Sequence, residues 1–549
     1  MPASAGMTVL GWMVGVVPIT LLFVLPLIAS LFYALAGGFD PQAWADLFQH
    51  PQLWSGLELS LLTSIASTIL ATMLAALIVT AIYESPSWRK LAAITGGMLA
   101  LPHLALAIGL SFLIMPSGVL ARFIAALLTG WQTPPNWITT HDPYGLSLIA
   151  ALVIKEAPFL IWVMAGILNR EDVRQSFANQ NAAATSLGHG SGSIWLRVFL
   201  PQLMPKLIWP LVIVFIYAAT VVDMSLVIGP TQPPTLATVI WADINSEQVT
   251  HNARGNVGAL FLSGALVLAL GFFYVLAKLV KPLWHEFIGA GPSTWGAPIM
   301  IGRAKHFALT WFYILIAALL LFMSIAQSWP FPDLIPTASP KAWGAIFQNP
   351  NALLTSIGLG LATSTAALLL ILLWLESVAQ KLDRLLLGLS LMLLGLPAIL
   401  VGLGQYRAFL QFGLTGNLWG LFLAHLLPVV AYMSVVLAGP YRALDPRFQA
   451  TAQSLQSSHG RFFRVIKLPL LKAPVLSALA VGFAVSFGQY IPAQLIAAGR
   501  FSTLPVEAVT LTSGTNRPLT AAFALLLLLP PFLVYVSAAY FGRSRWSQR

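Results

Sequence analysis

The sequence predicts an all-α polytopic membrane protein of about 12 transmembrane helices, arranged as two parallel six-helix repeats. Three observations lead to this fold class. Only 8% of the 549 residues are charged and 58% are hydrophobic, whereas soluble domains carry about 25% charged residues. The apolar residues also form runs of the roughly 20 residues that a helix needs to cross a bilayer. Finally, segments of the first half recur in the second half. A soluble enzyme, a disordered chain and a secreted disulfide scaffold are excluded.

The apolar runs place six expected spans in each half of the chain. In the first half they cover 9–36, 57–82, 91–115, 144–168, 205–229 and 257–280. In the second half they cover 308–327, 351–375, 386–411, 416–440, 472–498 and 519–541. The apolar stretch 119–128 is too short to span, so we expect it in a loop or at the membrane interface. The first span is longer than the core of a signal peptide and is expected to remain uncleaved.

The basic residues indicate the orientation of these spans. Twenty-one of the 28 Lys and Arg residues fall on the side that would hold both termini, six fall on the other side, and Lys155 lies within a span. Basic residues accumulate on the cytoplasmic side of membrane proteins, so both termini are predicted to be cytoplasmic. This topology accounts for the net charge of +11, and no nucleic-acid partner is expected.

Several short segments are duplicated. Residues 41–51 and 340–350 share six of eleven positions, including a Trp and a Phe. Leu-Pro dipeptides at 101–102 and 200–201 recur at 396–397 and 468–469, and Pro158 recurs as Pro428. An even number of spans in each copy gives both halves the same orientation. We therefore expect a first domain at 1–290 and a second at 291–549, with a translocation path between them.

The two longest basic loops on the cytoplasmic side occupy equivalent places in the two copies. The first, at about 170–203, and the second, at about 441–470, share the spacing of an Ala-rich stretch, a turn residue and a Leu-Pro dipeptide. The residues that define this pattern are Ala182, Ala183, Gly188, Leu200 and Pro201 in the first loop, and Ala450, Ala452, Gln456, Leu468 and Pro469 in the second. Ala favours a helix, and Gly ends it. A short helix of this kind can lie in a groove of a partner protein.

This spacing resembles the EAA loop of permease subunits from binding-protein-dependent ABC importers, whose pattern is Glu-Ala-Ala, three residues, Gly, nine residues, Ile or Val, one residue and Leu-Pro. Most of the chain resembles the fused two-domain permeases of the iron(III) and thiamine group. The resemblance implies a bacterial cytoplasmic (inner) membrane protein that carries a small molecule or ion through the lipid bilayer. It also implies an extracytoplasmic solute-binding protein and a separate ABC ATPase subunit, in two copies, docked on the loops.

The chain departs from that pattern at three positions. Ala182 and Ala450 stand where the family has Glu, so a fixed electrostatic contact is not expected from these positions. Gln456 stands where the family has Gly. The second loop is therefore expected to turn either at Gln456 or later, at Gly460.

Motifs for catalysis and cofactor binding are absent from the sequence. It contains no Gly-Lys dipeptide, which a phosphate-binding P-loop requires. The glycine-rich run at 188–192 therefore indicates a turn. The chain also has no Cys, no His-Glu-x-x-His and no Gly-x-Ser-x-Gly. We expect no catalytic residue, no metal site and no cofactor, so ATP hydrolysis would have to come from another chain.

Few ionisable groups lie within the expected spans. Lys155, Glu156 and Asp223 are the clearest, and Gln489 and Tyr490 occupy the place equivalent to Asp223 in the second copy. Because such groups are costly in a membrane, they are candidates for lining the translocation path. Alternatively, they form a buried structural pair, for example Lys155 with Asp223. The two acids favour a cationic solute, whereas Lys155 leaves an anion open.

A second class of transporter also fits two parallel repeats. In an ion- or proton-coupled secondary transporter, Lys155, Glu156 and Asp223 would be the coupling sites. The duplicated loops and the scarcity of acids within the spans favour the ABC permease. His103 and His425 are lone histidines within spans and are expected to be packing residues.

Overall fold

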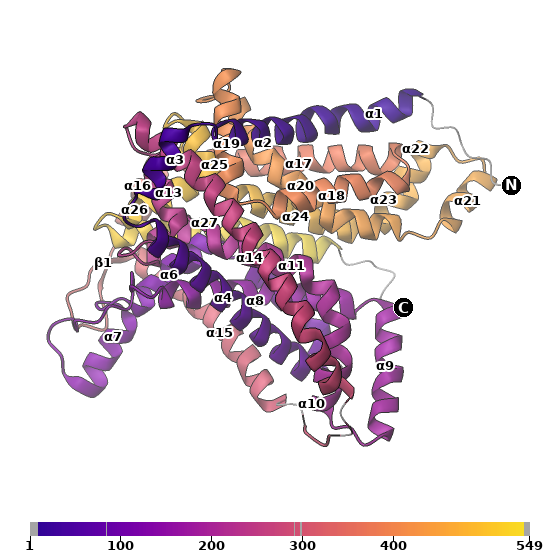
Figure 1. Ribbon diagram of the computed structural model, residues 1–549, viewed down its shortest axis with the longest axis horizontal. Coiled ribbons are helices and arrows are strands. Elements are labelled where there is room, and N and C mark those ends of the chain that lie inside the picture. The colour runs from indigo at the N-terminus through magenta and orange to yellow at the C-terminus, as the bar shows by residue number, and fades with distance from the viewer. Residues whose placement is uncertain (1–8, 84, 290, 292, 297–298, 543–549) are drawn as a thin grey trace.

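The computed structural model describes residues 9–83, 85–289, 291, 293–296 and 299–542, and most of them are helical (Figure 1). Within this part of the chain, ten helices are long and apolar enough to cross a membrane, or up to 12 if each of two bent helix pairs counts as one span. The predicted all-α polytopic fold is confirmed. The expected domain boundary adjoins residues 290 and 292, which lie outside the described residues, as do residues 1–8 and the basic residues at 543–549.

The helices of the first half follow the apolar runs. In chain order they are α1 Val9–Ile19, η1 Thr20–Val24, α2 Leu25–Ala36, α3 Pro41–Phe48, α4 Leu53–Ile82, α5 Trp88–Leu99, α6 His103–Ile114, α7 Val119–Ile124, η2 Ala125–Thr129, α8 Leu146–Leu168, α9 Glu171–Ser186, α10 Ser191–Ile194, η3 Trp195–Phe199, α11 Leu200–Thr220, α12 Asp223–Ile228, α13 Leu236–Ile244 and α14 Val249–Gly289.

The second half repeats most of this order; it adds one short hairpin and, among its described residues, has no counterpart of α7 and η2. Its elements are α15 Ile299–Ser324, β1 Ala326–Ser328, β2 Thr337–Ala338, α16 Lys341–Gln348, α17 Asn351–Ser377, η4 Gln380–Leu382, α18 Asp383–Leu394, α19 Ala398–Gln411, α20 Leu418–Arg442, α21 Arg447–Ser454, α22 His459–Phe462, η5 Phe463–Lys467, α23 Leu468–Leu470, α24 Lys472–Phe487, α25 Ile491–Ala497, α26 Leu504–Thr512 and α27 Arg517–Gly542. Strands β1 and β2 pair antiparallel.

Several expected spans are interrupted. The run 91–115 is split into α5 and α6 beside Leu101-Pro102, and 386–411 is split into α18 and α19, which meet at 102° beside Leu396-Pro397. Proline lacks a backbone N–H and disfavours a helical conformation of the residue before it, so each Leu-Pro dipeptide breaks its helix. The runs 205–229 and 472–498 are also broken, after α11 and after α24.

The stretch 119–128 differs from the expectation. Instead of a loop, it forms α7 and the π-helical turn η2, and with α6 it makes a candidate span, His103–Thr129. The expectation of a loop is wrong, because the length of this run was judged without α6, which precedes it. The alternative expectation, a place at the membrane interface, stays a prediction.

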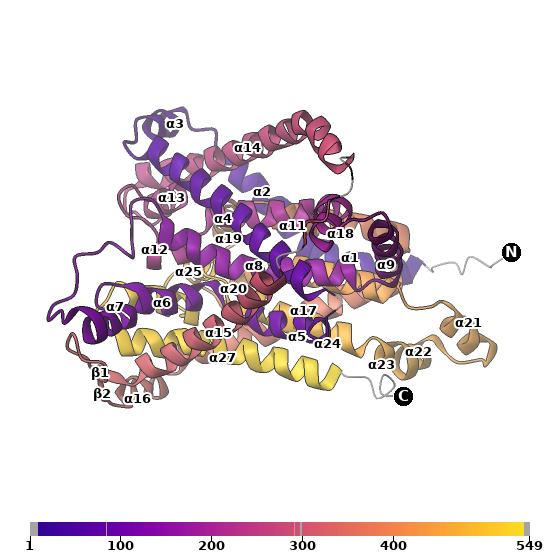
Figure 2. The same cartoon turned by 90° about the horizontal axis from the view of Figure 1, so that it is seen from below.

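The first helices of the two halves are exchanged. Helix α1 packs against α17 and α2 packs against α19, whereas α15 packs against α4 and α6 (Figures 1 and 2). A Cβ on Gly404 of α19 would lie 1.8 Å from the Ser30 carbonyl oxygen, and a Cβ on Gly109 of α6 would lie 2.6 Å from Ile316. Glycine is therefore needed at both crossings, which lie at matched positions of the repeat.

A hydrogen bond near one end of the bundle, where α13 and α26 lie (Figure 1), is repeated in the same way. The Leu236 amide donates to Ser60 Oγ over 2.9 Å, and the Leu504 amide donates to Ser356 Oγ over 2.9 Å. Each bond joins the start of a short helix, α13 or α26, to a long one, α4 or α17. At the opposite end, α9 and α21 lie near the start of α1 and the end of α27 (Figure 1).

Arg122 connects α7 of the first half to the segment between β1 and β2 in the second half. It is 2% exposed and donates to the carbonyls of Pro330, Asp333 and Trp329 over 2.7, 2.9 and 2.8 Å. Its guanidinium also lies 4.2 Å from the centre of the Trp329 ring. A guanidinium carries five donors in a rigid fork, which suits a contact with several carbonyls.

Replacing Arg122 by Met should destabilise the protein by about 2–3 kcal/mol, because the charged hydrogen bonds of a buried guanidinium to three carbonyls are lost. The thermal unfolding midpoint in detergent measures this effect. The control is Arg170→Met, because the exposed pair of Arg170 with Asp172 contributes about 0–1 kcal/mol. Equal midpoints for the two variants would contradict the role given to Arg122.

Candidate functional site

The first loop forms a short helix, a turn and a helix that re-enters the bundle, as predicted. Ala182 and Ala183 lie exposed on α9, and Gly188 takes a left-handed conformation with φ of +87°. The His189 amide donates to the Ala184 carbonyl over 3.1 Å, which closes the C-terminus of α9. After α10 and the π-helical turn η3, Leu200 and Pro201 begin α11.

The second loop turns at the equivalent position. Gln456 has a φ of +54°, and the Ser457 amide donates to the Ala452 carbonyl over 2.9 Å, as in the first loop. Of the two expected positions, Gln456 is therefore the turn, and Gly460 lies within α22. A non-glycine residue in this conformation costs about 1–2 kcal/mol.

The remaining predicted residues of the second loop also follow the repeat. Ala450 is exposed and Ala452 is buried on α21, while Leu468 and Pro469 begin α23 directly after the π-helical turn η5. Turns η3 and η5 are separated by 268 residues, as are Gly188 and Gln456. Both loops therefore end in the same irregular helical turn before they re-enter the bundle.

The two loops are attached to the bundle by different chemistry. On the first loop, Trp195 and Phe199 pack against the Tyr83 ring with centroids 5.6 and 6.4 Å away, and Phe177 stacks on Phe199 at 4.3 Å. Tyr83 directly follows α4. This contact is apolar and joins three helices.

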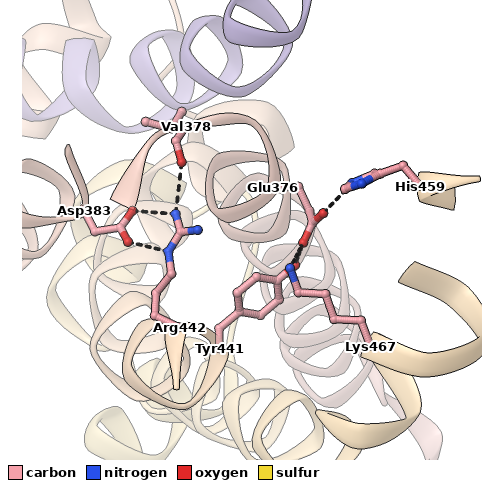
Figure 3. A network of polar contacts seen from close by, with 7 residues as sticks. All are labelled: Glu376, Val378, Asp383, Tyr441, Arg442, His459 and Lys467. Atoms are coloured by element: carbon pink, nitrogen blue, oxygen red, sulfur yellow. Dashed lines mark hydrogen bonds and ion pairs between the residues drawn. The ribbon is translucent and has the colours of Figure 1, made fainter. Parts of the chain in front are cut away.

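On the second loop the contact is ionic (Figure 3). Glu376, near the end of α17, accepts hydrogen bonds from Tyr441 and from Lys467 of η5, and its second oxygen lies 2.8 Å from His459 Nε2. Beside it, Arg442 donates from Nε and Nη2 to the two carboxylate oxygens of Asp383, over 2.6 and 3.0 Å. Sequence reasoning missed Glu376, because no local pattern relates it to Lys467, 91 residues later.

Lys155 in α8 bonds to backbone groups. Its Nζ donates to the carbonyls of Leu99 and Leu101 over 3.2 and 2.6 Å. The helix break at Leu101-Pro102 leaves these carbonyls without helical partners, and Lys155 supplies the missing donor. The suggested ion pair of Lys155 with Asp223 is absent among the described residues. Lys155 itself is 4% exposed.

Glu156 pairs with the first residue of α6. Its Oε1 lies 2.9 Å from His103 Nε2, and the His103 ring lies 4.5 Å from the Tyr217 ring. His103 is therefore a hydrogen-bonded histidine inside the bundle, and its expected role as a packing residue stays a prediction. The position of His103 directly after Leu101-Pro102 could have indicated this polar contact, because a residue at a helix break faces groups that a continuous helix would cover.

Asp223 begins α12 at the break that follows α11. Its carboxylate is within electrostatic range of His103 and of Tyr490. Tyr490 comes from the second half and packs against Trp241 of the first, with ring centroids 5.3 Å apart. Gln489 donates to the His425 carbonyl over 3.1 Å, while its own Oε1 is buried and has no partner among the described residues. The breaks of both halves thus meet around these polar groups.

Interrupted helices, exchanged first helices and paired loops together define a multi-pass transport permease. Residues 367–547 match the family described as "Binding-protein-dependent transport system inner membrane component". The inner membrane ABC transporter permease protein YnjC of Escherichia coli strain K12 is 30% identical over 94% of this chain and 93% of its own length. The chain therefore belongs to the inner-membrane permeases of binding-protein-dependent ABC importers, which is a transport family and not an enzyme family.

Two further relatives fit the same assignment. The thiamine transport system permease protein ThiP of Escherichia coli strain K12 is 25% identical over 96% of both chains. The putative 2-aminoethylphosphonate transport system permease protein PhnV of Salmonella typhimurium is 27% identical over 40% of this chain and 84% of its own length. Likeness to YnjC and ThiP over more than nine tenths of their length supports the fused two-domain type.

Replacing Lys155 by Met should lower stability by about 1–3 kcal/mol, because two buried carbonyls lose their donor. The thermal unfolding midpoint measures this loss, and Lys90→Met, which changes an exposed lysine, is the control. If the Lys155→Met protein unfolds at the same midpoint as the wild type, the structural role given to Lys155 is excluded.

Proposed function

We propose that the chain forms the translocation path of an ABC importer and that two copies of a separate ATP-hydrolysing subunit dock on the loops at about 170–203 and 441–470. An extracytoplasmic binding protein delivers the solute to the opposite face, and both termini lie in the cytoplasm. The main support is the recurrence of one left-handed turn at Gly188 and Gln456. If the two loops had no shared function, the second would have no reason to keep so costly a conformation at Gln456. The recurrence therefore favours a shared docking role.

The attachments of the loops suggest how docking moves the bundle. A displacement of the first loop would act on α4 through Tyr83, and a displacement of the second would act on α17 through Glu376. Helices α4 and α17 are equivalent in the repeat and contact the exchanged helices α15 and α1. The ATP-bound and ATP-free subunits must contact the loops differently, because only a difference in affinity shifts a conformational equilibrium.

The path residues favour a cationic solute. The ammonium of Lys155 is bonded to backbone carbonyls and forms an ion pair with neither acid among the described residues. Glu156 and Asp223 therefore remain two acidic groups that a cationic solute could meet. Rings of Tyr217 and Tyr490 lie near these acids, and aromatic faces attract cations. Gln489 adds a buried oxygen that no group in the described part of the chain contacts by a hydrogen bond. Thiamine and spermidine/putrescine, after which relatives are named, are the first cations to test. 2-Aminoethylphosphonate, after which another relative is named, carries an ammonium and a phosphonate and so tests a solute without net positive charge.

Gly188→Val should uncouple ATP hydrolysis from transport, because a β-branched residue is strongly disfavoured in the left-handed conformation. We expect ATP-driven uptake into vesicles to fall by about tenfold, the size of a typical coupling free energy. Gln456→Gly is the matched control, since it keeps the turn and removes strain, and it should keep full uptake. Uptake driven by an ion gradient without ATP would contradict the proposed function.

Glu156→Gln and Asp223→Asn should each reduce uptake of a cationic solute by about tenfold, through loss of a charged contact. Initial uptake rates at several solute concentrations measure the effect. Glu58→Gln, which neutralises an exposed carboxylate on α4, is the control and should behave as wild type. Undiminished uptake by the Asp223→Asn protein would remove Asp223 from the path.

A further inference from the structure

The segment that joins the two halves lies against the first loop. Residues 291 and 293–296 follow α14 and precede α15, and we call them the linker. The Gly190 amide donates to the Ser293 carbonyl over 2.8 Å, and the Ser193 amide donates to the Trp295 carbonyl over 3.3 Å. Arg197 Nη1 also donates to the Gly291 carbonyl over 2.8 Å. The linker is therefore bonded to the loop at three points.

These bonds replace a helix cap. Helix α10 starts after Gly190, which has no side chain that could accept a bond from the first amides of the helix. In the second loop, Ser458 Oγ accepts the Arg461 amide at the start of α22. Gly190 and Ser458 are 268 residues apart, so they are equivalent in the repeat. The carbonyls of the linker thus do in the first loop what a serine does in the second.

The glycine-rich run at 188–192 is explained by this contact. A Cβ on Gly190 would lie 2.5 Å from the Trp295 carbonyl oxygen, and a Cβ on Gly192 would lie 2.4 Å from the Trp295 ring. The equivalent of Gly192 is Gly460, where a Cβ would meet only Arg464, at 3.9 Å. Gly188 serves the turn, while Gly190 and Gly192 leave space for the linker.

The linker also changes the surface of the first loop. Trp295 is 51% exposed and borders a shallow hollow of about 270 Å³ whose other walls are Ser193, Leu196, Arg197, Phe287 and Ser293. The Arg197 guanidinium lies 4.9 Å from the centre of the Phe287 ring. A half-exposed Trp beside an Arg is the composition typical of energetically dominant positions in protein interfaces.

We propose that the linker is part of the first docking surface: its carbonyls cap α10, and the Trp295 indole contacts the ATP-hydrolysing subunit. The two docking sites are then unequal, since only the first depends on the linker. This inference rests on the proposed function, because it takes the loop as the place where that subunit binds. Continuity of Trp295 with Leu196 and Arg197 around one hollow favours this partner over lipid.

The seating of the linker can be tested on the full chain alone. Gly192→Ala should displace Trp295, so the amides at 190–193 should exchange with deuterium at least about tenfold faster once the carbonyls leave them. Gly460→Ala is the matched control, and exchange at 458–461 should stay as in wild type. Unchanged exchange at 190–193 in the Gly192→Ala protein would overturn the proposed cap.

The docking role needs a second measurement. The ATP-hydrolysing subunit is obtained from the wild-type complex, which is isolated through a tag on this chain. The subunit is recognised by its ATP hydrolysis and is then titrated onto each variant in detergent. Trp295→Ala keeps the carbonyls and should weaken binding to the permease by about tenfold. Gly192→Ala should weaken it as well, whereas Gly460→Ala should not.

Each contrary result has a distinct meaning. Equal weakening by Gly192→Ala and Gly460→Ala would overturn the inequality of the two sites. Unchanged affinity of Trp295→Ala, with poorer recovery from membranes, would make Trp295 a lipid anchor and overturn its docking role. A wild-type chain that binds no ATP-hydrolysing subunit would remove the proposed function and the docking role together, but the exchange result would still report the seating of the linker.

Discussion

The close crossing of exchanged helices at Gly109 and Gly404 is the contact on which the rest of this structure depends. At these two points one half approaches the backbone or side chain of the other so closely that no Cβ fits. Small residues allow this approach in a membrane, where association of helices relies on packing and not on exclusion of water. Because α1 and α2 lie on the second half and α15 on the first, neither half can complete its own packing. The helix breaks, the central polar groups and the loops are all positioned relative to this exchange.

Interruptions of helices within a bilayer must also be satisfied internally, since lipid offers no hydrogen bonds. The break between α5 and α6 is satisfied by the ammonium of Lys155. The starts of α13 and α26 are joined to long helices by Ser60 and Ser356. Polar side chains that look anomalous in an apolar sequence thus accompany the proline breaks. The places where a solute can meet polar groups follow from the positions of those breaks.

The sequence predicted features that depend on composition and spacing. Apolar runs located the helices, and the repeated Ala-rich pattern located both loops, including the turn at Gly188. It did not predict features that depend on distant partners. Lys155 and the Leu101 carbonyl are 54 residues apart, and Glu376 and Lys467 are 91 apart, so no local periodicity relates them. The sequence also left undecided whether the second loop turns at Gln456. A glutamine by itself disfavours the left-handed conformation, and here the surrounding loop imposes it.

The unlike attachments of the two loops have a consequence for how this protein diverged. A permease assembled from two identical subunits must carry the same loop twice, so every change affects both sites at once. Fusion in one chain removes that restriction, and here one loop is held by rings around Tyr83 while the other is held by charges around Glu376. Salt screens the charges but leaves the ring contacts intact. The two halves of one transporter can therefore differ in their tolerance of the ionic environment of the cell.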